Sequence, residues 1–201
     1  MKRKVKSVVG LKAIIMFGLF WWHSWLENPP FDLGARACEI LFVVSGFLVS
    51  YNHYGKNEDF SWERSITYTK GKFIQMWPLH FISFLIYIVA SQYPLFEDKI
   101  QWIIAALNLS FLQAWFRNEA IFFSFNGASW FLSALLFCYF ITPLLQLLVK
   151  KIRSVALFLP VAVLVRLFFE YVQRRRPEAF GYSVHVSPFI RALEYFIGMM
   201  A

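Results

Sequence analysis

The stretch GLKAIIMFGLFWWH, residues 10–23, is apolar enough to enter a membrane, yet it has a lysine near its start and a histidine at its end. At 100° per residue, Lys12 and His23 lie about 20° apart around a helix and roughly 16 Å apart along its axis. They therefore share one helix face. Because ionisable side chains inside a membrane are costly, the pair predicts a functional site on that face.

The whole chain has the composition of a membrane protein. Of its 201 residues, 59% are hydrophobic, and 24 Phe, 8 Trp and 9 Tyr exceed what the core of a soluble domain needs. The apolar residues form long uninterrupted runs, unlike the alternation of strands or the single stripe of soluble helices. The sequence therefore predicts an all-α, polytopic transmembrane helical bundle that needs a lipid bilayer.

A spanning helix needs about 20 mostly apolar residues. By this measure we expect about six spans and the start of a seventh near residue 189; the six are 8–26, 34–52, 73–92, 100–116, 129–149 and 153–172. No internal repeat divides the chain, so we expect one domain over residues 1–201, incomplete at its C-terminus. Cys38 and Cys138 lie in apolar runs, at a spacing that suggests neither a zinc site nor a disulfide, and we predict buried thiols and no metal.

The net charge of +8 comes from clusters at the ends of apolar segments: MKRKVK at 1–6, KGK at 70–72, KKIR at 150–153 and RRR at 174–176. Membrane topology and anionic headgroups explain this distribution, so we predict no nucleic-acid partner. The first cluster places the N-terminus in the cytoplasm. If 100–116 crosses the membrane, KKIR lies outside; if it turns back, KKIR lies inside, as we expect, and RRR then lies on the opposite side.

His23 is the first candidate for chemistry, because an imidazole can accept and return a proton near physiological pH. The alternatives are a structural hydrogen bond between helices and a position among the interfacial tryptophans Trp21, Trp22 and Trp25. Lys12 could instead extend its long side chain to the cytoplasmic headgroups.

Later segments add further polar candidates. Arg36 and Glu39 are three residues apart, so they could lock a helix as an ion pair, orient His23 or line an acceptor path. Ser45 with Gly46 suits close helix packing. His80, two residues after Pro78, is a rival base or a structural partner of unpaired helix carbonyls.

The order and wording of five motifs resemble the bacterial membrane acyltransferase family 3, the O-acetylases that modify lipopolysaccharide, peptidoglycan, exopolysaccharides and some antibiotics. The family's first helix reads GLRAIA…H with ten residues between arginine and histidine, and here Lys12 takes the place of the arginine. LFVVSGFL is similar to the family's FFVLSGFL, and KFIQMWP, with Lys72, Gln75 and Pro78, to its R-x-x-R-x-x-P turn. WFLSALLF and EYFIGMMA are similar to two later motifs. The resemblance spans nearly the whole chain.

The resemblance implies transfer of an acyl group, usually acetyl, from cytosolic acyl-CoA to a hydroxyl of a cell-envelope or exported carbohydrate. No bound cofactor is expected, and acetyl-CoA is a co-substrate. His23 is then the catalytic base or a transient acyl carrier, and Lys12, Lys70 and Lys72 attract the CoA phosphates. Possible supporting or acceptor-path residues are Arg36, Glu39, Ser45, Gln75, Trp130 and Ser133. The location implied is the bacterial cytoplasmic membrane.

Two other readings stay open. Buried Lys, His, Arg and Glu also suit a transporter or flippase, although such proteins usually contain two related halves. The family's acyltransferases usually have about ten helices, and Gln75 replaces a charge that they have. An inactive, shortened homologue is therefore the third reading.

Overall fold

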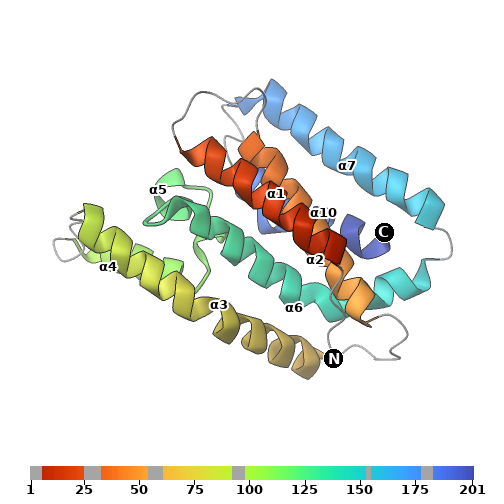
Figure 1. The fold of residues 1–201 in the computed structure, drawn as a ribbon, viewed down its shortest axis with the longest axis horizontal. Helices are drawn as coiled ribbons and strands as arrows, with labels where there is room; N and C mark the ends of the chain where they lie inside the picture. The colour runs from red at the N-terminus through yellow and green to blue at the C-terminus, as the bar shows by residue number, and fades with distance from the viewer. Residues whose placement is uncertain (1–5, 25–32, 54–60, 92–97, 153–154, 178–182) are drawn as a thin grey trace.

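The computed structural model describes residues 6–24, 33–53, 61–91, 98–152, 155–177 and 183–201, and these residues fold into helices (Figure 1). The long helices are α1 (Lys6–His23), α2 (Leu33–His53), α3 (Trp62–Ser91), α6 (Trp130–Lys151) and α7 (Val155–Arg175). The shorter ones are α4 (Lys99–Leu109), η1 (Gln113–Trp115), α5 (Glu119–Phe122), η2 (Gly127–Ser129), α9 (Ser183–Val186) and α10 (Pro188–Met200). The predicted helical membrane bundle is confirmed.

Three of the predicted spans are helices long and apolar enough to cross a membrane. They are α2, α3 and α6, measured over Gly34–Asn52, Trp62–Ser91 and Gly127–Lys151 within the described residues. Helix α3 begins 11 residues before the predicted start at residue 73 and continues through Pro78 without a break. Helices α1 and α7 form where predicted, but they are not among the helices that meet this measure of length and apolarity.

The predicted span at 100–116 is wrong. Helix α4 ends at Leu109, and its 11 residues reach only about 16 Å. Phe111 then adopts a left-handed backbone with φ of 57°, which turns the chain away from the helix axis. The physical reason is that Asn108 and Gln113 interrupt the apolar run: both are fully buried and hydrogen-bond to Ser129 instead of facing lipid.

The segment after α4 returns along α3. The Trp77 indole donates to the Leu109 carbonyl at 3.1 Å, and the Asn126 amide reaches the Ser83 hydroxyl at 3.5 Å. Phe125 lies 4.5 Å from the Phe84 ring, centroid to centroid. Residues 98–129 therefore run from the C-terminal end of α3 toward its middle and then return along the same side of that helix. As a result, α6 starts near the end of the bundle where α3 ends.

The core lies where α2, α6 and α10 meet, in the centre of Figure 1. Phe42, Cys138 and Tyr195 are fully buried there, and the Tyr195 hydroxyl is 2.8 Å from the Thr142 hydroxyl. Both predicted free thiols are buried. A helix crossing this close depends on Gly46, since a Cβ there would come within 1.8 Å of the Tyr195 carbonyl oxygen. The expectation that Gly46 serves close packing is confirmed.

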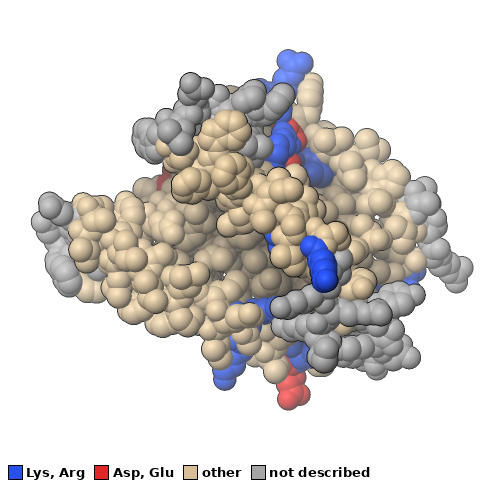
Figure 2. All heavy atoms as spheres, in the orientation of Figure 1, with Lys and Arg blue, Asp and Glu red and all other residues tan. Residues whose placement is uncertain are grey.

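The outer surface is apolar over wide areas. Ile14, Phe17 and Phe20 of α1 are each about two-thirds exposed or more, and α3 presents a similar row of aliphatic side chains. Figure 2 shows that charged side chains on this face gather mostly near its upper and lower edges. Since water-exposed apolar surface of this extent is unfavourable, lipid is the natural environment of these helices.

Candidate active site

A cavity of about 1860 Å³ lies among α1, α2, α3, the segment 119–132, α7, α9 and α10. Its walls carry apolar side chains together with a concentrated set of ionisable ones. The cavity-lining residues with polar side chains that bear on function are His23, Arg36, Glu39, Lys72, Gln75, His80, Arg166, Glu170, Arg174, His185 and Arg191. Apolar walls with a few convergent polar groups are the usual form of a ligand site.

His23 is the last residue of α1 and lines this cavity. The end of α1 is held against the start of α2, because the Trp22 ring occupies the space that a side chain at Gly34 would need. On the same helix face, Ile15 is buried and Leu19 packs on the core. The imidazole itself is exposed and has no hydrogen bond to another described residue. It is thus accessible to a molecule in the cavity.

The other predicted site residues fall into two groups. Arg36, Glu39, Lys72, Gln75 and Trp130 line the cavity with His23.

The remaining four lie elsewhere. Lys12 is half-buried in α1, about three turns before His23, and it does not line the cavity. Lys70 is exposed and also lies outside the cavity. The Ser45 hydroxyl donates to Leu41 of its own helix at 2.7 Å. The Ser133 hydroxyl donates to the Phe111 carbonyl at 2.6 Å, so it holds the turn after α4 in place.

Lys72 and Gln75 lie in the middle of α3, three residues apart and therefore on one face. The part of the sequence expected to be a turn is helical. The Lys72 ammonium lies 4.9 Å from the centre of the Tyr139 ring and 5.5 Å from that of Tyr68, a cation–π arrangement that fixes the charge at the cavity wall. His80, the rival base, is buried and bonds through Nε2 to the Asn108 carbonyl oxygen at 3.1 Å.

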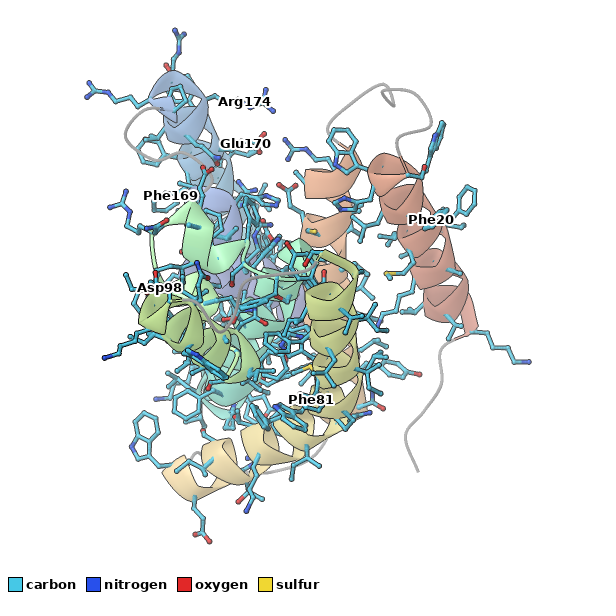
Figure 3. All side chains as sticks on the ribbon, turned by 90° about the vertical axis from the view of Figure 1, so that its left-hand side faces the viewer. Phe20, Phe81, Asp98, Phe169, Glu170 and Arg174 are labelled. Atoms are coloured by element: carbon cyan, nitrogen blue, oxygen red, sulfur yellow. The ribbon has the colours of Figure 1, made fainter. Side chains whose placement is uncertain are left out.

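A cluster of arginines and glutamates joins α2, α7 and α10 at the cavity wall. Arg36 contacts Glu39 at 2.7 Å, as predicted, and also Glu170 of α7. Arg166 of α7 contacts Glu39 and Glu194, each at 2.5 Å. Figure 3 shows Glu170 directed inward from α7, with Arg174 one turn beyond it and Phe169 directed the other way. The cluster thus ties α2 to α7 and α10, although Arg36 and Glu170 are 134 positions apart in the sequence.

Sequence reasoning missed Arg166, Glu170, His185, Arg191 and Glu194. Two signals in the sequence pointed to four of them, and none pointed to His185. Arg166 and Glu170 are charges inside the apolar segment 153–172, which by themselves indicate function or pairing within a bundle. Arg191 and Glu194 repeat the three-residue spacing of Arg36 and Glu39, and they form the same contact, at 2.6 Å.

Comparison with known proteins places this cavity in context. A model of the acyltransferase-3 family, described as an acyltransferase domain, matches residues 5–201. The chain belongs to the acyltransferase-3 family. It is also similar to the acyltransferase MdmB of Streptomyces mycarofaciens, with 29% identity over 123 residues.

The alignment with MdmB covers 60% of this chain and 30% of the relative, so the chain spans less than a third of that protein's length. No solved structure matches the chain. Membership of the acyltransferase-3 family confirms the resemblance found in the sequence motifs.

Proposed function

We propose that this protein transfers an acyl group, most simply acetyl, from cytosolic acyl-CoA to a hydroxyl of a cell-envelope or exported carbohydrate. The observation that carries the proposal is the exposed imidazole of His23 in a cavity that also contains Lys72, Arg36 and Gln75. The cavity volume of about 1860 Å³ leaves room for the acyl-bearing arm of CoA beside a sugar. Family membership supports the acyl-transfer chemistry.

His23 acts in this proposal as the general base. It takes the proton of the acceptor hydroxyl while the hydroxyl oxygen attacks the thioester carbonyl, and it returns that proton to the departing thiolate. A transient acyl-imidazole at His23 is the alternative route to the same products. Both routes need an imidazole that substrates can reach, which suits its exposure to the cavity.

Lys72, at the cavity wall, supplies a positive charge for the CoA phosphates in this proposal. Lys12 and Lys70, outside the cavity, add positive potential along the donor's approach from the cytoplasm. Gln75 and Trp130 line the acceptor path in this proposal, while Arg36 and Glu39 hold the wall beside His23. The N-terminus lies in the cytoplasm of a bacterial cell, and the protein lies in the cytoplasmic membrane.

The test is thiol release from acetyl-CoA by the purified chain in lipid nanodiscs, with cell-envelope glycan as acceptor. We expect His23→Ala to lower turnover by at least about 10²-fold, the usual contribution of a positioned general base. Thermal unfolding of the variant should match that of the wild type, because the exposed imidazole has no partner among the described residues. Full turnover by His23→Ala would contradict the role of His23, and no turnover by the wild type would contradict the proposed function.

A further inference from the structure

His185 is a second histidine at the cavity, brought there by the short helix α9 between α7 and α10. Its ring lies against the indole of Trp130, with 4.8 Å between ring centres and planes inclined by 60°. Trp130 is itself only 5% exposed, so it forms a rigid wall for the imidazole.

The hydrogen bonds of His185 fix the position of its proton. Arg191 donates from Nε to the His185 carbonyl oxygen at 2.6 Å and from Nη2 to the ring atom Nδ1 at 3.3 Å. A guanidinium has no acceptor, so Nδ1 must be the bare nitrogen and Nε2 must carry the hydrogen. Nε2 has no hydrogen bond to any described residue, and it is not among the fully buried atoms that lack a partner. Since His185 lines the cavity, Nε2 is accessible to a molecule there. The free group is therefore an N–H donor.

Arg191 cannot easily leave this position. Its side chain is fully buried, and it contacts both carboxylate oxygens of Glu194, at 2.8 and 2.6 Å. Glu194 in turn accepts from Arg166, which also bonds Glu39 of α2. Burial and the neighbouring positive charges of Arg191, Arg166 and Arg36 lower the pKa of His185 to about 3. At neutral pH the ring is thus neutral and too weak a base to take a proton.

We propose that His185 is a second catalytic residue, whose Nε2–H donates a hydrogen bond to the carbonyl oxygen of the acyl group during transfer. This proposal rests on the proposed function. When the acceptor oxygen forms its bond to the thioester carbon, the carbonyl π pair moves onto oxygen, and His23 takes the hydroxyl proton. The pair returns as the C–S bond breaks, and the thiolate receives that proton from His23. His185 donates a hydrogen bond throughout and keeps its own proton, as oxyanion donors do.

Two substitutions separate this role from packing. His185→Gln places an amide N–H near the position of Nε2, whereas His185→Phe keeps the ring against Trp130 and removes the donor. We expect His185→Phe to lower kcat for thiol release from acetyl-CoA by about 10²–10³-fold with little change in KM, the usual loss of one oxyanion donor. His185→Gln should retain a large part of kcat. Equal losses in both variants, or full kcat in His185→Phe, would overturn the proposal.

A second measurement does not depend on activity. The chain has four histidines, and ¹⁵N NMR of the imidazoles in nanodiscs reports which ring nitrogen carries the hydrogen. The signals lost in His185→Gln assign the residue. We expect a neutral ring with hydrogen on Nε2 at pH values well below 6.5. Hydrogen on Nδ1, or a charged ring at neutral pH, would overturn the role of His185 alone. No thiol release by the wild type would instead overturn the proposed function and this role with it.

Discussion

Gly46 and Gly198 act by lacking side chains. A Cβ at Gly198 would come within 1.8 Å of the Val43 carbonyl oxygen, and one at Gly46 would come equally close to Tyr195. The two glycines thus let α2 and α10 touch backbone to backbone. This contact places Arg191 and Glu194 of α10 beside the ion-pair cluster that includes Glu39 of α2. The reactive wall of the cavity therefore depends on two residues that have no chemistry of their own.

Replacing either glycine with alanine should destabilise the bundle. For Gly46→Ala and Gly198→Ala we expect a loss of about 3 kcal/mol or more, because the obstructing atoms are backbone and the helices must move apart. Gly10→Ala is the matched control: a Cβ there meets nothing within 4 Å, and alanine favours the helix by about 0.5–1 kcal/mol. Thermal unfolding in one detergent compares the three. A midpoint for Gly46→Ala at or above that of Gly10→Ala would contradict the close contact.

Lys72 should affect donor binding more than catalysis. We expect Lys72→Met to raise KM for acetyl-CoA by about tenfold, equivalent to roughly 1.4 kcal/mol, because one charge at the cavity wall is lost. Lys151→Met removes the same charge from an exposed position at the end of α6 and should leave KM nearly unchanged. Steady-state kinetics at low salt gives both values. The same KM for Lys72→Met and the wild type would show that the phosphates bind elsewhere.

At the scale of elements, the sequence predicted most helices but not how they meet. Long apolar runs located α2, α3 and α6, since a spanning helix needs little more than length and hydropathy. The same rule failed at 100–116, where Asn108 and Gln113 are satisfied by Ser129, a partner that no periodicity reveals. Likewise, Arg36 and Glu39 were visible as neighbours, but Glu170, 134 positions away from Arg36, was not.

The ion-pair cluster makes a testable claim about three helices. We expect Arg166→Met to destabilise the bundle by about 3–5 kcal/mol, because Glu39 and Glu194 would lose a partner at a mostly buried site. Arg174→Met should cost about 0.5 kcal/mol or less, since Arg174 is 70% exposed and its ion pair within the described part of the chain is with Glu170, one turn away. Thermal unfolding of the two variants measures the difference. Similar midpoints would mean that packing alone joins α2, α7 and α10.

At the scale of the whole molecule, the path of residues 98–129 decides the topology. Because this segment returns to the side where α3 ends, α6 runs back toward the end of the bundle that holds the start of α1 (Figure 1). Lys150 and Lys151 then lie at the same end as Lys6, and Arg174 to Arg176 lie at the other. Residues 2–4 of the first basic cluster lie outside the described residues. The path of 98–129 thus favours KKIR on the side of the N-terminus.

Cysteine labelling tests this arrangement, and the chain suits it because Cys38 and Cys138 are buried and should react slowly. We expect Arg176→Cys to react with a membrane-impermeant maleimide added to intact spheroplasts, since RRR lies at the end of the bundle opposite the N-terminus, which we propose to be cytoplasmic. Lys151→Cys, equally exposed, should react only after the membrane is permeabilised. The reverse result would contradict this arrangement, because it follows if residues 98–129 cross the membrane or if the N-terminus lies outside. Labelling of both variants from outside would instead mean that α7 does not cross the membrane, because the two positions flank its opposite ends.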